Sequence, residues 1–518
     1  MYLLVLTAVL AVYVYFRFRT NFSLPFIGNA LSIPSSHQWI AFSRWGKEYG
    51  KHIALLCSDI IHLDVCGTSI VVLNSYNAAI DLLDKRSAIY PIGHWLSFRV
   101  YDAANITSSR PKLIMARELM GWENTLFFQP YGSPWLAGRR LMHEQFQSSA
   151  ATRFHPQQII ASHHLLSRLL ESPQDFSDHI RHAAGSLSMS IAYGIETLRA
   201  QDPLIETAAA SLAAVVVAAN PGSFLVDVLP FLKHVPAWVP GAGFQRKARQ
   251  WKQETAKMVN IPFQITKQAL TDGVAAPSFT RHGLESMDAF KDAKSQEELI
   301  KWTAADIYVG DVAAIQTFML GMLANPEAMK AAQAEIDTVV RPGFLPTFED
   351  EERLPYISAI RQETLRWNNV TPMAVPHSTT EEDIYQNYRI PAGSVVLANV
   401  WAMTHDEHEY PEPFKFRPER FLKDRKLDLE VRDPTNLAFG FGRRVCPGQH
   451  LGSSFLWIVI ASILSSFDIT KAVDKGGKIV EPSYAYLPGL VGFPVPFRCS
   501  VQPRSREKAN LVKMLVEG

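Results

Sequence analysis

The feature that most constrains this chain is a short glycine-rich loop near its C-terminal end that carries one cysteine. Residues 439–448 read Phe-Gly-Phe-Gly-Arg-Arg-Val-Cys-Pro-Gly, so Cys446 follows two arginines. Apolar residues recur at helical spacing over 450–467, which predicts a helix whose first backbone N–H groups point back at the cysteine. Positive charge and a helix N-terminus lower a thiol's pKa, and the thiolate is the form that binds metals. The loop therefore predicts a thiolate metal ligand that a flat ligand can approach closely; the alternative is a buried cysteine in a tight turn.

Length and composition favour one large globular domain. The chain has 518 residues, 47% hydrophobic and 19% charged, without a low-complexity run, a repeat or a Gly/Ser-rich spacer. The net charge of +1 argues against nucleic acid as the main partner. The absence of a Cys-x-x-Cys pair disfavours a disulfide framework and a cysteine-rich zinc site, and it indicates a reducing compartment. The four cysteines are Cys57, Cys66, Cys446 and Cys499.

The first residues have the composition of a membrane anchor. Residues 1–16 are apolar or aromatic except for Thr7, and Arg17 and Arg19 follow. At about 1.5 Å per residue this run is slightly shorter than a bilayer core of roughly 30 Å, which flanking residues can complete. Because the charge follows the run, we favour an anchor with the body in the cytosol over the alternative, a cleaved signal peptide. We predict a transmembrane anchor over 1–19, a proline-containing hinge over 20–35 and a single domain over 36–518.

The cysteine loop matches the pattern Phe-x-x-Gly-x-Arg-x-Cys-x-Gly at every fixed position, and it resembles the haem-binding loop of the cytochrome P450 family. The resemblance implies a mainly α fold with a small β region behind the anchor. It also implies haem b as cofactor, with the Cys446 thiolate as the iron ligand, whose electron density favours O–O cleavage. Phe439, Gly442, Arg444 and Gly448 then become cofactor-binding positions.

Two further motifs match the family in order along the chain. Glu363 and Arg366 share a face of the helix predicted over 355–367, and Arg420 lies in the later segment Phe-Arg-Pro-Glu-Arg-Phe. The resemblance implies that these three residues form a buried charge network with a structural role, supporting the haem loop.

Haem carries two propionates, which need cationic or hydrogen-bond-donating partners. The resemblance places such partners on the helix that begins near Tyr131, in the segment Val-Pro-His and in the cysteine loop. Taken singly, each would be an ordinary solvated side chain. The four positions are Trp135, Arg139, His377 and Arg444.

The central helix departs from the family pattern. The family carries an acidic or amide residue followed by threonine, after an Ala/Gly-Gly pair, and these groups deliver protons to bound oxygen. Asn325 before proline predicts a helix N-cap and fixes the register; counting back, about four residues, roughly one turn, are missing. The threonine is absent, and we predict Asp311 as catalytic acid, with Gly310 opening space above the iron. Segments 51–58 and 91–109 are extra; these differences are either real or errors of gene prediction.

The resemblance implies a monooxygenase that inserts one oxygen atom from O2 into a lipophilic small molecule. The chain has neither a dinucleotide-binding fingerprint nor a flavin domain, so electrons would come from a separate NADPH–cytochrome P450 reductase. The amino-acid sequences of the loop and of residues 496–500 are most similar to those of fungal members active in secondary metabolism or xenobiotic oxidation. A basic set beside the loop is either the docking face for the reductase or a solvated surface: Lys423, Arg425, Lys426 and Arg443.

Several alternatives stay open. We expect a single-pass protein of the endoplasmic reticulum membrane, and the apolar stretch 224–244 either dips into the lipid headgroups or belongs to the core. Leu490 and Val491 are candidates for substrate contact. Because the relay threonine is missing, a peroxide-using or isomerising haem-thiolate enzyme and a degenerate haem-binding protein are the rival functions. His405 and His408 are rejected as a metal pair because no third ligand has suitable spacing.

Overall fold

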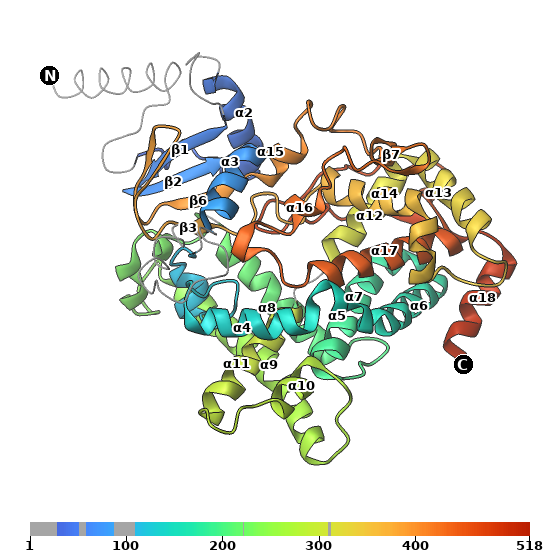
Figure 1. Ribbon diagram of the computed structural model, residues 1–518, viewed down its shortest axis with the longest axis horizontal. Coiled ribbons are helices and arrows are strands. Elements are labelled where there is room, and N and C mark those ends of the chain that lie inside the picture. Colours follow the sequence, from blue (N-terminus) through green and yellow to red (C-terminus); the bar gives the residue numbers. More distant parts are fainter. Residues whose placement is uncertain (1–27, 51–58, 88–108, 221, 309–311, 518) are drawn as a thin grey trace, which may run out of the picture.

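A computed structural model describes residues 28–50, 59–87, 109–220, 222–308 and 312–517 (Figure 1). The predicted anchor over 1–19, the first part of the hinge over 20–35, the extra segment 51–58 and all but the last residue of the extra segment 91–109 lie outside the described residues. Gly310 and Asp311 also lie outside them.

Helices make up most of the described chain, as predicted. The observed helix ends lie close to those expected from the amphipathic and apolar patterns. The helices predicted over 355–367 and 450–467 are observed as Pro355–Trp367 and Gln449–Ser466. The α-helices are α2 (Gln38–Gly50), α3 (Tyr76–Ala79), α4 (Ser133–Phe146), α5 (Ser148–Ala151), α6 (His155–Glu171), α7 (Phe176–Tyr193), α8 (Pro203–Ala219), α9 (Gly243–Thr271), α10 (Phe279–Glu285), α11 (Ala293–Ala305), α12 (Val312–Ala324), α13 (Pro326–Val339), α14 (Pro355–Trp367), α15 (Val400–Thr404), α16 (Thr435–Ala438), α17 (Gln449–Ser466) and α18 (Arg506–Glu517).

The strands form small sheets, and the largest lies to one side of the helical body, next to α2 and α3 (Figure 1). Its order is β1-β2-β6-β3, with β2 and β6 parallel and the other neighbours antiparallel. This sheet carries His377 on β3, at its edge. The strands are β1 (Ile60–Val65), β2 (Thr68–Leu73), β3 (His377–Ser378), β4 (Asp383–Tyr385), β5 (Tyr388–Ile390), β6 (Val395–Ala398), β7 (Leu422–Lys423), β8 (Lys426–Leu427), β9 (Phe467–Lys471) and β10 (Cys499–Pro503).

Helix α17 lies in the middle of the core. Every residue from 455 to 466 is buried, and α6, α12, α13 and α14 pack around it (Figure 1). A helix that is apolar on all sides is stable only when it is surrounded. Because the cysteine loop directly precedes α17, this burial fixes where the loop lies.

Two described stretches are long and apolar enough to cross a bilayer, and both lie mostly inside the protein. One is α17; the other is Ala293–Ala324, which runs over the undescribed residues 309–311. Their most apolar windows are 72% and 73% buried, respectively. They are therefore core helices of the body.

The central helix changes its hydrogen bonding after α11. Helix α11 ends at Ala305, a 3-10 turn covers Asp306–Tyr308, and α12 is described from Val312 onward, so the predicted missing turn around Gly310 and Asp311 lies outside the described residues. The predicted N-cap downstream is confirmed, since the Asn325 side chain accepts a hydrogen bond from the Ala328 N–H at 3.2 Å.

Candidate functional site

The cysteine loop is held by its own backbone. The Cys446 N–H donates to the Phe439 carbonyl at 2.7 Å, and the Gln449 N–H donates to the Cys446 carbonyl at 3.3 Å, which ties the loop to α17. Gly440 and Gly442 have φ of +81° and +53°, a region that disfavours side chains. Cys446 is only partly buried, unlike a cysteine that fills a core.

Three arginines from distant parts of the chain lie near this loop: Arg139 and Arg444 face Trp135, and the charge of Arg110 acts on Arg444. The Arg139 guanidinium donates to the Val445 carbonyl at 2.7 Å, next to the cysteine. The Arg444 guanidinium carbon lies 4.1 Å from the centre of the Trp135 ring, and that of Arg139 lies 5.7 Å from it. Arg110 donates to the carbonyls of residues 375 and 376, both at 2.8 Å, directly before His377. The structure thus brings the four predicted propionate partners into one region.

The electrostatics of this cluster fit an anionic ligand. Burial, and then the charges of Arg110 and Arg139, lower the pKa of Arg444 to about 8. Burial and the charge of Arg139 lower the pKa of Arg110 to about 9, and burial also lowers the pKa of Arg139. The Arg110 Nε is buried without a hydrogen-bond partner. Because buried like charges are costly without counter-ions, the cluster suits a ligand that brings carboxylates, as haem does.

Arg110 was missed by the sequence analysis. It follows the extra segment 91–109 and precedes a proline, and no motif or spacing marks it. Its partners at 375 and 376 are 265 and 266 residues away along the chain. Only the fold could identify it.

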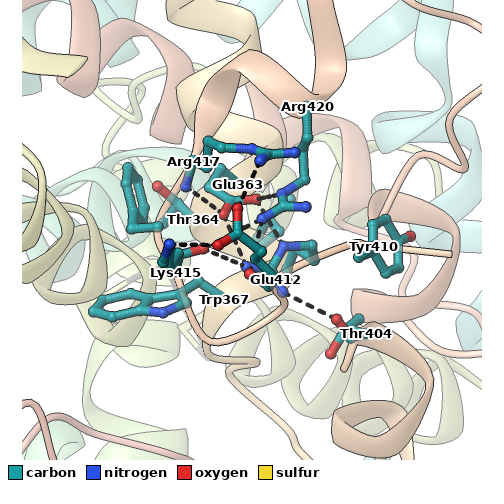
Figure 2. A network of polar contacts seen from close by, with 12 residues as sticks. Glu363, Thr364, Trp367, Thr404, Tyr410, Glu412, Lys415, Arg417 and Arg420 are labelled. Atoms are coloured by element: carbon teal, nitrogen blue, oxygen red, sulfur yellow. Dashed lines mark hydrogen bonds and ion pairs between the residues drawn. The ribbon is translucent and has the colours of Figure 1, made fainter. Parts of the chain in front are cut away.

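The predicted charge network is present and buried (Figure 2). Arg366 binds the Glu363 carboxylate with two hydrogen bonds of 2.7 and 2.8 Å, and the Arg420 Nε donates to it at 3.1 Å. Glu363 and Arg366 have no exposed side-chain surface. The Arg417 backbone N–H adds a further bond to Glu363 at 2.7 Å.

The same arginines fasten the chain segment that leads toward the cysteine loop. Arg366 donates to the Thr404 carbonyl at 3.0 Å and to the Lys415 carbonyl at 3.2 Å. Arg420 donates to the Pro411 carbonyl at 2.6 Å. One buried carboxylate therefore orients two guanidinium groups, which in turn hold the irregular backbone between α15 and the residues around Arg420.

The two histidines that the sequence analysis rejected as a metal pair differ in their surroundings. His405 is buried while His408 is exposed, and the His405 Nδ1 lies 2.9 Å from the Trp401 carbonyl. Burial and the nearby charge of Arg366 lower the pKa of His405 to about 3. Within the described part of the chain, no group of three or more His, Cys, Asp or Glu side chains could hold a metal ion.

A buried carboxyl in the 3-10 turn that follows α11 was also missed. Asp306 accepts a hydrogen bond from the Leu126 N–H at 2.8 Å through Oδ2, while its buried Oδ1 has no partner. The Leu126 carbonyl in turn accepts from Arg444 at 3.2 Å. Burial raises the pKa of Asp306 to about 8. Asp306 therefore links the end of α11 to the segment that contacts the arginine cluster.

We expect Asp306→Asn to stabilise the protein increasingly as pH rises from 4 to 8. The folded pKa of about 8 lies above the ordinary value of 3.8. Between these pH values the carboxyl ionises in the unfolded chain but stays protonated in the folded protein. The wild type therefore loses stability as pH rises, whereas the Asp306→Asn protein, with its neutral amide, does not. Thermal unfolding of both proteins across this range is the measurement. The exposed Glu123→Gln should follow the wild type; an Asp306→Asn curve parallel to wild type would contradict the expectation.

The body is helical with a small lateral sheet, the loop cysteine precedes a buried helix, and the nearby cations suit carboxylates. These are features expected of a haem protein. Comparison with known sequences gives the family. The family model for Cytochrome P450 matches residues 20–488, and the chain belongs to the cytochrome P450 family.

Similar proteins cover nearly the whole chain. Cytochrome P450 monooxygenase 98 of Postia placenta is 43% identical over 498 residues, which is 95% of this chain and 91% of that protein. Cytochrome P450 monooxygenase ple1 of Rhodocybe pseudopiperita is 40% identical, over 95% of this chain and 90% of its own. Tryptamine 4-monooxygenase of Psilocybe cyanescens is 39% identical, over 93% and 92%. The predicted family, fold and enzyme class are confirmed: this is a haem monooxygenase.

Proposed function

We propose that this enzyme holds haem b with the Cys446 thiolate as iron ligand and inserts one oxygen atom from O2 into a lipophilic small molecule. Bound haem supplies the oxygen chemistry. The observation that carries the proposal is the pair of arginines that face Trp135 beside the cysteine loop, the half-buried Arg139 and the buried Arg444. The absorption spectrum of the reduced, carbon monoxide-bound protein tests the thiolate ligand.

The chain's own residues hold and orient the cofactor. The guanidinium groups of Arg110, Arg139 and Arg444 would pair with the propionates. This pairing would offset the burial and the mutual repulsion that together lower the pKa of Arg110 and Arg444. Trp135 and His377, both nearly fully buried, complete this side of the site. In the loop, Gly448 lies close to the Cys446 sulfur, since a Cβ added at Gly448 would be 3.9 Å from it, an ordinary van der Waals contact.

A substrate wall is supported by the turn between residues 484 and 495. Its backbone pairs Leu487 with Phe493 and Val495 with Ala485 through bonds of 2.8 Å. At the tip, a Cβ added to Gly489 would lie 3.7 Å from a Val216 methyl on α8. Leu490 packs against the large buried core that contains α17. Leu490 and Val491 directly follow this tip in the chain. An apolar turn against an alanine- and valine-rich helix favours a lipophilic substrate, and one relative is named for tryptamine.

Electrons would come from a separate NADPH-dependent reductase that docks on basic residues in and before the cysteine loop in the sequence. Lys423, Arg425 and Lys426 are exposed on the short β7–β8 hairpin, whereas Arg443 donates to the Tyr131 hydroxyl at 2.5 Å. Lys423 also meets Glu430 at 3.3 Å, so Arg425 and Lys426 are the stronger docking candidates.

Reversing the charge of Lys426 tests this docking face. We expect Lys426→Glu to raise the KM for the reductase several-fold, with the difference shrinking at high salt, because rim charges act mainly on association. Peroxide-driven turnover should not change. Arg389→Glu, an equal charge change on the exposed β4–β5 hairpin, is the control. Reductase kinetics that are the same in both variants would remove the docking face.

Asp311 stays our candidate acid for proton delivery, with Gly310 opening space above the iron. The rival function is a peroxide-using or isomerising enzyme, and the absence of the relay threonine from the sequence favours it. We expect NADPH and reductase to support product formation. Asp311→Asn should then divert electrons, so that NADPH consumption persists while product falls. Turnover with hydrogen peroxide and none with reductase would favour the rival.

Membrane attachment is supported by the loop between α8 and α9, in addition to the predicted anchor. Leu225, Phe231 and Trp238 are 70%, 64% and 81% exposed, so at these positions the core interpretation of 224–244 is wrong. A cluster of exposed apolar side chains marks an interaction surface. We infer that this loop contacts the lipid headgroup region and that the enzyme is a single-pass protein of the endoplasmic reticulum facing the cytosol.

A further inference from the structure

A surface hollow of about 410 Å³ opens where α9 begins. Its floor is aromatic: Phe224 and Phe244 pack against the main core, and Phe224 meets Trp251 edge-on with ring centres 6.0 Å apart. Its rim is cationic, with the exposed Arg246 and Lys247. The hollow therefore offers apolar and positively charged surface side by side.

The positive charge around this hollow is not neutralised locally. Arg246, Lys247, Arg249 and Lys252 are exposed and lie within the first turns of α9, and none of them forms an ion pair with a carboxylate among the described residues. The first acidic residue of α9 is Glu254, which pairs with Lys257 at 3.3 Å. Cations concentrated at this end of a helix are electrostatically unfavourable, and a bound anion would offset that cost.

The hollow adjoins the apolar loop that we place at the membrane. The Arg246 Nη1 donates to the Ala237 carbonyl at 2.7 Å, which holds the turn carrying the exposed Trp238 against the start of α9. A soluble anion would use the cations but leave the exposed apolar side chains unexplained. An amphiphile with an anionic head uses both, since its head meets Arg246 and Lys247 while its tails lie beside the loop.

We propose that this hollow binds the head group of an anionic phospholipid, with Lys247 and Arg246 contacting the phosphate. The proposal rests on the membrane contact of this loop proposed above and adds the class of lipid. Such a contact, at the start of a 29-residue helix, would fix how the body tilts on the membrane. Apolar insertion alone would not distinguish one headgroup from another.

The test uses the full chain in lipid nanodiscs of phosphatidylcholine alone or mixed with phosphatidylserine. The readout is hydrogen exchange of backbone amides in residues 224–250, at low and high salt. We expect exchange to slow several-fold further when phosphatidylserine is present at low salt, and this extra protection to disappear at high salt. Lys247→Glu should abolish the extra protection. Lys252→Glu, with the same charge change on the same helix but outside the hollow, should keep most of it.

The outcomes separate the two proposals. Equal protection in both lipid mixtures, or equal loss in Lys247→Glu and Lys252→Glu, would overturn the head-group site while leaving the membrane contact standing. If residues 225–240 exchange in nanodiscs as fast as the exposed segment 288–295, the membrane contact fails and the head-group site fails with it.

Discussion

Replacing Glu363 by glutamine should unfold the enzyme at markedly lower temperature and prevent stable haem loading. Glu363 and Arg366 are fully buried, and Arg420 is nearly so. The amide keeps the shape of the carboxylate but leaves two guanidinium groups without a counter-ion. Removing one member of a buried ion pair costs about 3–5 kcal/mol, a large share of the roughly 5–15 kcal/mol that stabilises a typical folded protein.

The chain offers a matched control for this substitution. Glu412 belongs to the same group of contacts (Figure 2), but its side chain is 48% exposed and pairs with the exposed Lys415 and Arg417. Exposed pairs contribute about 0–1 kcal/mol, so Glu412→Gln should unfold close to the wild-type temperature. Denaturation and haem content should be measured together for both variants. A Glu363→Gln protein as stable and as well loaded as Glu412→Gln would show that the network does not support the site.

Replacing Cys446 by serine should abolish monooxygenase turnover. Serine keeps the loop's shape, and the bond from the Cys446 N–H to the Phe439 carbonyl involves only backbone, so the loop should persist. The hydroxyl does not ionise near neutral pH and cannot replace a thiolate as ligand and electron donor. We expect a loss well beyond the 10–100-fold effect of removing an outer-shell partner.

Cys66→Ser is the control for this loss, because Cys66 is exposed in the β1–β2 turn, in a different part of the fold. Its turnover should equal that of the wild type. Activity measured with reductase, and separately with hydrogen peroxide, distinguishes loss of the ligand from loss of electron supply. Retention of both activities in Cys446→Ser would mean that another side chain binds the iron.

The features that the sequence predicted are those encoded by adjacent residues or by a periodic pattern of residues. The loop around Cys446 is local, and the apolar spacing of α17 gave its bounds to within one residue. Glu363 and Arg420 are 57 positions apart, and only the family resemblance paired them before the structure showed their contact. That contact is between segments, so no local pattern encodes it.

The residues that sequence missed depend on long-range packing. Arg110 takes its place from carbonyls about 265 positions away, and Asp306 from a backbone N–H 180 positions away. Neither has a distinctive neighbourhood in the sequence. The apolar composition of 224–244 fitted both a core and a membrane surface, since composition does not report exposure. Only the fold showed that the Trp238 side chain is exposed to solvent.

The most direct test of the central claim is the absorption spectrum of the reduced, carbon monoxide-bound protein in recombinant membranes, recorded beside Cys446→Ser. A thiolate ligand predicts a strongly red-shifted Soret band in the wild type that is lost in the variant. No such band in the wild type, or a band that survives in Cys446→Ser, would contradict haem ligation by Cys446 and the oxygen chemistry that depends on it.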